Sequence, residues 1–533
     1  MIRLFGREPW SLDSLTPPWG ELKSIYDRIR SGVLEPLPDD DVVFKPNRFR
    51  WVGGAMDGVL ARQEEGAEKE KRVFAIVSTL QQLEQRADNK SLKTLYEAVV
   101  ENALVGCIDA VIEQMTKSDR GHNEPRLREI GRYFAGRAGH REAVKFGLAL
   151  IGAFGDAQDS ELLKTLGKSD EFTLFAGIAL ARVSDHPEKA LWDLAKEVHG
   201  WGRVQIVRRL KDTDDSEIQA WMLREGFRNN IMDEYLACIC ARAGKLHLAL
   251  NEQFVDTIIL DAATEMIRAL ITGGPAEDID DYEHSGDACE GYLNIVWSRT
   301  DLNLRHFLTV AKLKWFLTQP DGWERRNQKQ WTDSRRGNMQ SLADDVVGRE
   351  SWRSKIADAL SSENDQIFHE GDEAAQVLSI DTWELHFLRV RAKPLASSSW
   401  YRLMQQTNES RINEVLTFAE SILPFERIET GPGDELGLGP NYQPHQALDW
   451  ILQDLRRFPG HGWRMIKAGL RSPVVRNRNM AINALSAWDP KSWSTEMRSA
   501  VELALGIEPR ADVKKRLADV LAPAKAVSPK FHA

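Results

Sequence analysis

The chain has 533 residues, 42% of them hydrophobic and 28% charged, and its formal net charge is −10. This composition is that of a folded protein, and it excludes wholesale disorder and collagen-like or fibrous architectures. The acidic total argues against a surface that coats nucleic acid or an anionic membrane, although a local basic patch is compatible with it.

The chain shows no secretory or membrane-spanning pattern. Its first residues, MIRLFGREPW, are charged and are not followed by an apolar segment, as a signal peptide requires. The uncharged apolar stretch 146–155 is about half the ~20 residues that span a bilayer. Four cysteines are too few for a disulfide framework and suit a reducing compartment. We therefore expect a cytoplasmic protein without a membrane span.

The first 70 residues are expected to form an irregular cap. Six of the 21 prolines lie before residue 47, and each of them restricts helix continuation. One helix is predicted there, from Trp19 to Ser31.

A repeat of fixed period follows between Arg141 and Leu250. Asp156, Asp185 and Asp214 are spaced 29 and 29 residues apart, and each stands between two helical patterns. Glu188 and Glu217 follow the second and third of these aspartates by three residues, which predicts that Asp185 and Asp214 cap the second helices. The units are therefore helical hairpins of about 29 or 30 residues.

Such hairpins bury their apolar faces only by stacking, so the sequence predicts an all-α solenoid. The period resembles the short variety of HEAT repeat, and the segment 462–488, GWRMIKAGLRSPVVRNRNMAINALSAW, is similar to it. The resemblance implies a HEAT- or armadillo-like fold. We expect a cap (1–70), helical repeats (71–272), a helical middle region with an acidic loop (273–400), C-terminal HEAT-like repeats (401–521) and a flexible tail (522–533).

The last third of the chain also resembles bacterial HEAT-like proteins that are sometimes labelled limonene hydroxylase. That label implies oxygen activation on haem, flavin or iron. The sequence holds no Glu-x-x-His pair and no cysteine in a Gly-rich ligand loop. We therefore expect no cofactor, no metal and no catalytic residue of an oxygenase.

Two C-terminal segments are candidate sites. The loop GPGDELGLGP (431–440) brings Asp434 and Glu435 near His445 in sequence, which suits acid-base chemistry, while the alternative is a loop that covers one edge of the solenoid. The stretch 456–478 has seven basic and no acidic residues, which predicts the most positive surface of the molecule. The candidate binding residues are Arg456, Arg457, Arg464, Lys467, Arg471 and Arg478, with Arg476 assigned a structural role.

A third segment combines aromatic and basic residues. Trp315, Trp323 and Trp331 recur every eight residues among seven lysines and arginines, a pattern that nucleic-acid-binding proteins use. The preceding segment 273–290 is acidic and is expected to be an exposed loop.

The preferred hypothesis is a cytoplasmic α-solenoid scaffold that binds a macromolecular partner, in first place a protein. Nucleic acid at the basic C-terminal repeats is the second partner considered. The alternatives are an enzyme or regulatory module that acts on nucleic acid or a small molecule at the Asp434, Glu435 and His445 loop, and an immunity or defence protein.

Overall fold

The computed structural model describes residues 10–44, 51–55, 57, 66–101, 103–117, 121–327 and 331–522. Within these ranges the chain is all-α: it forms no strand, and its one β-bridge joins Glu435 to Val474. The predicted fold class is confirmed. The chain divides into two compact units, Met1–Arg349 and Glu350–Ala533. No helix in the described ranges is long and apolar enough to cross a membrane.

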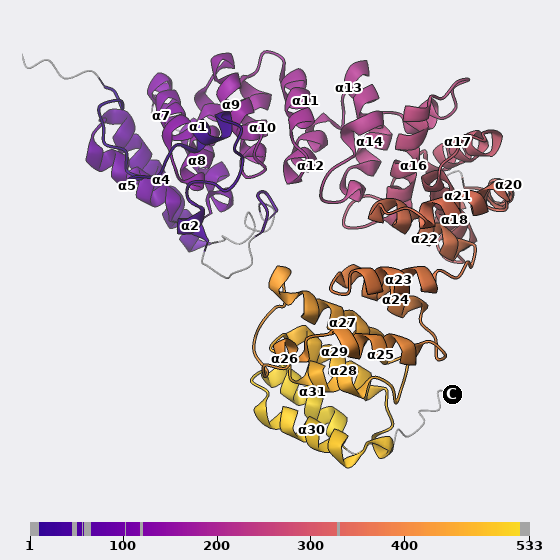
Figure 1. Cartoon of the computed structure of the whole chain (residues 1–533). Coiled ribbons are helices and arrows are strands. Elements are labelled where there is room, and N and C mark those ends of the chain that lie inside the picture. The colour runs from indigo at the N-terminus through magenta and orange to yellow at the C-terminus, as the bar shows by residue number, and fades with distance from the viewer. Residues whose placement is uncertain are drawn as a thin grey trace, which may run out of the picture. The chain divides into compact units, whose positions relative to one another are not determined.

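The first unit is a solenoid of stacked helical hairpins (Figure 1). Its helices are α1 (Ile25–Arg30), α2 (Asp40–Val43), α4 (Ala67–Gln85), α5 (Asn89–Val100), α6 (Ile108–Thr116), α7 (Glu124–Arg137), α8 (Arg141–Phe154), α9 (Ser160–Gly167), α10 (Thr173–Val183), α11 (Pro187–Glu197), α12 (Trp201–Val207), α13 (Ser216–Trp221), α14 (Ala237–Ala243), α15 (Leu246–Ala249), α16 (Thr257–Thr272), α17 (Ser285–Ser298), α18 (Leu304–Thr318), α19 (Trp323–Asn327) and α20 (Asp333–Val347).

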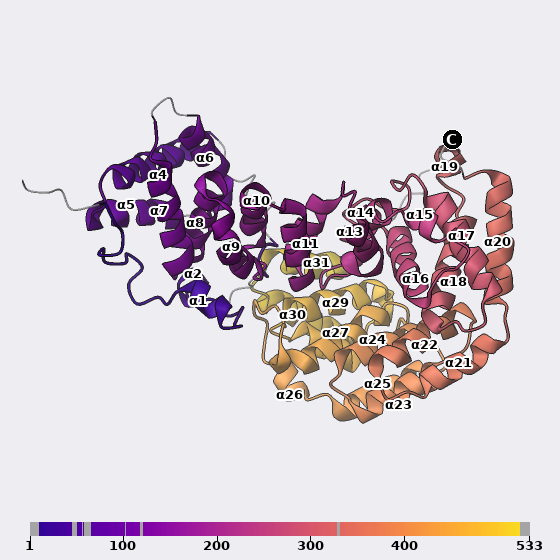
Figure 2. The same ribbon diagram turned by 90° about the horizontal axis from the view of Figure 1, so that it is seen from above.

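The repeat predicted from the three aspartates corresponds to the alternation of α8, α10 and α12 with α9, α11 and α13 (Figure 1). Figure 2 shows α8 to α11 from above. Helices α6, α8, α10 and α12 pack side by side in one row, which we call the inner row. Two predicted caps were wrong by one residue: α11 begins after His186, with Pro187 in its first turn, and α13 is capped by Asp215. A reciprocal cap forms instead between Asp156 and Asp159.

The N-terminal segment packs on the solenoid as a cap. Its predicted helix Trp19–Ser31 is shorter than expected, because Ser24 caps α1 and the preceding residues form turns. The Trp19 ring lies 5.5 Å from that of Tyr133, and Ser24 Oγ donates a hydrogen bond to the carbonyl of Gly136 at 2.9 Å. The cap is therefore fixed to α7.

The second unit also consists of α-helices, which surround a core of their own. These are α21 (Ser351–Leu360), α22 (Asp365–Val377), α23 (Trp383–Ala392), α24 (Ser397–Gln406), α25 (Ile412–Ile422), α26 (Phe425–Ile428), α27 (Gln443–Leu455), α28 (Trp463–Leu470), α29 (Val475–Ser486), α30 (Thr495–Ile507) and α31 (Ala511–Leu521). One continuous apolar cluster runs from Trp383 to Leu517.

The boundary between the two compact units lies in sequence between Arg349 and Glu350, inside the predicted middle region 273–400. The other predicted segment limits stay predictions, and the tail from residue 523 lies outside the described residues. The acidic segment 273–290 is a loop only in its first part, because α17 begins at Ser285.

Candidate functional site

The inner row of the first unit borders an apolar cavity of about 870 Å³. Apolar side chains from α6 and α10 form its walls, among them Ile112 and Ile178, and charged side chains of the same helices, Asp109, Glu113 and Arg182, also line it. We call this space the apolar cavity.

Helix α8 contributes Leu148 and two small residues to the wall of the cavity. Ala149 and Gly152 line the cavity from α8. A Cβ atom at Gly152 would lie 3.1 Å from the Cα atom of Ala179, so the glycine also lets α8 approach α10 closely. Gly152 thus determines how closely α8 and α10 pack beside the cavity.

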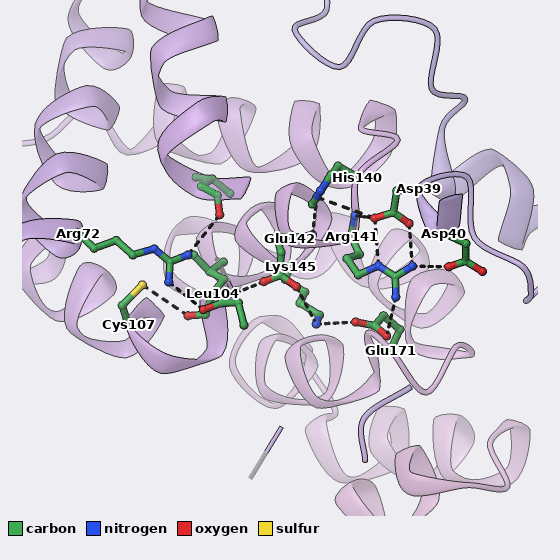
Figure 3. A network of polar contacts seen from close by, with 12 residues as sticks. Asp39, Asp40, Arg72, Leu104, Cys107, His140, Arg141, Glu142, Lys145 and Glu171 are labelled. Carbon is green, nitrogen blue, oxygen red and sulfur yellow. Dashed lines mark hydrogen bonds and ion pairs between the residues drawn. The ribbon is translucent and has the colours of Figure 1, made fainter. Parts of the chain in front are cut away.

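A second cavity of about 490 Å³ lies beside the N-terminal end of α8, and charged residues dominate part of its wall. Arg141, Glu142, Lys145 and Glu171 line it, together with apolar residues of the segment after α2. Figure 3 shows how these charged side chains point toward one another. We call this space the charged cavity.

Arg141 is the centre of one half of the network. Its Nε and one Nη atom donate hydrogen bonds to the two carboxylate oxygens of Asp39 at 3.0 and 2.9 Å, and it also contacts Asp40 and Glu171. Burial alone lowers the pKa of Arg141, but its hydrogen bonds with Asp39 and the charge of Glu171 outweigh burial and raise it. Burial lowers the pKa of the neighbouring His140.

Lys145 is the centre of the other half. Its Nζ lies 2.6 Å from Glu171 Oε1 and 3.1 Å from Glu142 Oε1, and the side chain is buried. Burial lowers the pKa of Lys145, and the two glutamates outweigh burial and raise it. Glu142 also accepts a hydrogen bond from the backbone N–H of Leu104 at 2.5 Å. Both glutamates therefore already have firm partners.

Asp57 lines both cavities. Its side chain is 5% exposed, and Oδ2 has no hydrogen-bond partner. Burial raises the pKa of Asp57 to about 6, although the charge of Lys145 opposes the shift and those of Glu171 and Glu142 add to it. A buried carboxylate with an unpaired oxygen is costly to the fold, which marks this position as a functional candidate.

The predicted basic surface of segment 456–478 is largely neutralised. Six of its seven basic side chains pair with carboxylates, in the pairs Arg457 with Asp454, Arg464 with Glu429, Lys467 with Glu496, Arg471 with Glu429, Arg476 with Asp449 and Arg478 with Glu508. Only Arg456 is exposed without a partner among the described residues. The count of acidic residues within segment 456–478 did not include these carboxylates, because they belong to other parts of the chain.

Arg478 in particular was wrong as a binding residue. Its side chain is 1% exposed and binds Glu508 through Nε and Nη2, at 2.8 and 3.0 Å. It also donates hydrogen bonds to the carbonyls of Ser472, Pro473 and Gly433. Its role is to hold the fold together.

The loop 431–440 is fixed against the turn between α28 and α29 by the bridge between Glu435 and Val474. The carboxylate of Asp434 pairs with Arg510 at 2.9 Å, away from the other two candidates. Glu435 accepts a hydrogen bond from Tyr442, and its charge acts on His445. His445 is buried, neither ring nitrogen has a partner, and burial lowers its pKa. The structure therefore brings together two of the three residues.

The tryptophan-rich segment and the acidic loop neutralise each other. Arg326 pairs with Asp280, and Arg335 with Asp287 and Glu290. Trp323 and Trp331 are buried and offer no stacking surface, whereas Trp315 is 57% exposed. This arrangement does not favour nucleic-acid binding at this segment.

The charged residues at the N-terminal end of α8 were not among the candidates predicted from the sequence. A signal was present in the sequence. Arg141, Glu142 and Lys145 are the charged residues of the otherwise apolar helix α8, where unpaired charge is unfavourable. Their partners, however, come from α2 and from Glu171, far away in sequence. Asp57 offered no signal, because its environment depends on the packing of distant helices.

The fold defines the chain as an α-solenoid. No family model and no curated protein matches it. It is similar to a crystal structure of an engineered protein from the Northeast Structural Genomics Consortium, with 14% identity, a TM-score of 0.23, and coverage of 84% of this chain and 98% of that chain. A TM-score this low carries no argument about the present protein.

Proposed function

We propose that this protein is a cytoplasmic α-solenoid scaffold of HEAT-like repeats that binds a protein partner through the inner row of its first unit. The observation that carries the proposal is the apolar cavity, whose apolar walls also bear charged side chains from α6 and α10. Protein interfaces combine an apolar centre with a polar rim, and solenoids bind partners on the extended surface that stacked repeats create.

The charges favour a protein over nucleic acid. The basic side chains of segment 456–478 are mostly paired within the chain, and Asp109 places negative charge at the apolar cavity, where Glu113 is paired with Lys117. A phosphate backbone would be repelled there, whereas apolar anchors of a protein partner would be desolvated in the cavity.

Affinity capture from the native host with two matched variants tests the proposal. Ile178→Glu places a charge in the wall of the apolar cavity, and Ile258→Glu places one on α16, where Ile258 is 59% exposed and lies outside the cavity. We expect a protein that wild type and Ile258→Glu retain and Ile178→Glu loses, and that binds purified wild type directly. Equal retention by Ile178→Glu contradicts the proposal.

A further inference from the structure

The carboxylate of Asp57 is buried where the two cavities share a wall, and one of its oxygens is unpaired. An unpaired buried polar atom costs free energy on folding, because it loses its hydrogen bonds to water. A ligand that supplies a donor at this point would recover that cost. Among the described residues, Asp57 Oδ2 is the one buried carboxylate oxygen without a hydrogen-bond partner.

The charges around Asp57 define the kind of donor. Among the described residues, five carboxylates lie around two cations, Arg141 and Lys145; the carboxylates are those of Asp39, Asp40, Asp57, Glu142 and Glu171. Both cations are engaged by the other four carboxylates. A further positive charge would therefore be attracted, and a negative one repelled.

We propose that Asp57 is the counter-ion for a lysine or arginine side chain of the protein partner, whose neighbouring apolar side chains occupy the apolar cavity. This inference rests on the proposed function and deepens it, because it specifies the chemistry of the partner segment. Lysine and arginine lay their aliphatic stems along apolar surface while the charged head reaches a polar group. The apolar walls at α6 and α10 match the aliphatic stem, and the carboxylate of Asp57 matches the charged head.

The partner segment is therefore both apolar and basic. Asp109 adds negative charge along the same cavity, Glu113 is paired with Lys117, and Arg182 is the one cation among the described residues that line it. An acidic segment would meet these carboxylates and Asp57, so charge complementarity selects against it.

Selection of a random-peptide library on the immobilised full chain tests the inference. We expect wild type to enrich peptides that combine apolar residues with lysine or arginine. Asp57→Asn should lose the basic preference and keep the apolar one, and Asp185→Asn, which changes an exposed carboxylate outside both cavities, serves as the matched control. Ile178→Glu should lose both preferences. Circular dichroism confirms that each variant is folded.

The strongest selected peptide is then synthesised with its basic residue intact or replaced by norleucine. We expect Asp57→Asn to weaken binding of the intact peptide at least about tenfold. The norleucine peptide should bind wild type and Asp57→Asn equally. This peptide substitution keeps the test decisive even if Asp57→Asn does not fold.

The outcomes separate the two proposals. Apolar peptides without basic enrichment, or equal affinity of wild type for the intact and norleucine peptides, overturn the role of Asp57 and leave the proposed function standing. Acidic enrichment also overturns that role. If wild type enriches nothing beyond what Ile178→Glu enriches, the inference and the binding role of the inner row both fail.

Discussion

Arg478 joins three parts of the second unit through one guanidinium group. It pairs with Glu508 after α30, binds carbonyls at the start of α29, and donates a hydrogen bond to Gly433 in the loop 431–440. Both members of the ion pair are buried. Such a pair contributes little when intact, but the loss of one member leaves an uncompensated charge in the core.

Arg478→Met is therefore expected to destabilise the second unit by about 3–5 kcal/mol, because Glu508 is left buried without its cation. Urea unfolding measures the effect. Arg456→Ala is the control from the same basic stretch, and its exposed position predicts a change within about 0.5 kcal/mol. Equal stability of the two variants would show that Arg478 is not a structural residue.

Asp57→Asn is expected to stabilise the protein at high pH. The pKa of Asp57 is raised from the ordinary 3.8 to about 6 by burial, with Lys145 opposing and Glu171 and Glu142 reinforcing the shift. The folded state therefore holds its proton more tightly than the unfolded state, and wild-type stability falls as pH rises from about 4 through 6.

The expected gain of Asp57→Asn is about 3 kcal/mol near pH 8 and below about 1 kcal/mol near pH 4. Urea unfolding of wild type and variant across this range checks it. Asp109→Asn, at an exposed position, should show no such pH dependence. A gain that does not change with pH would mean that Asp57 is not a destabilised carboxylate.

At the scale of elements, glycine determines how closely α7 and α8 pack. A Cβ atom at Gly147 would lie 2.4 Å from the backbone nitrogen of Ala135 and 2.7 Å from the carbonyl oxygen of Gly131. By contrast, a Cβ atom at Gly136, which lies on α7, would meet only Leu162 at 3.7 Å. The two positions therefore test packing separately from helix propensity.

Gly147→Ala is expected to destabilise the first unit by about 1–3 kcal/mol, because the added methyl group pushes α7 away from α8. Gly136→Ala should be neutral or stabilising by up to about 1 kcal/mol, since alanine favours the helix. Thermal unfolding compares the two variants. If both alanines stabilise the protein, the close helix contact is absent in solution.

The sequence predicted which segments of the repeat are helical, but not the residue at which each helix begins. The period of Asp156, Asp185 and Asp214 predicted the alternating helices, because the apolar periodicity of a solenoid repeat is local. The caps of α11 and α13 differed by one residue: α11 begins with Pro187 after His186, which makes no side-chain cap bond, and Asp215 rather than Asp214 caps α13.

At the scale of the whole molecule, the all-α solenoid was predictable and the candidate site was not. Stacked repeats contact mainly their sequence neighbours, so local patterns contain most of the fold. The charged network joins α2, α8 and Glu171, and the basic stretch 456–478 is neutralised by residues as distant as Glu508. Such pairings depend on tertiary packing, which a single sequence does not display.

The second unit is expected to fold alone, and its boundary is testable. Its apolar cluster includes Trp383 and Phe387 on α23, and Trp383 Nε1 donates a hydrogen bond to Thr407 Oγ1 at 2.9 Å. A fragment of residues 350–533 retains these contacts. A fragment of residues 401–521 begins at the boundary that the sequence predicted, and it lacks both aromatic rings. It also exposes Phe418 on α25, whose ring packs against that of Phe387.

Residues 350–533 should therefore give a helical circular dichroism spectrum and a cooperative thermal transition, whereas residues 401–521 should unfold at a lower temperature or not fold. Loss of large core aromatics costs about 3–5 kcal/mol each, which is a large part of the stability of a domain. Arg478→Met in the longer fragment should lower its transition as it does in the full chain. If residues 401–521 are as stable as 350–533, α23 does not belong to the core of this unit.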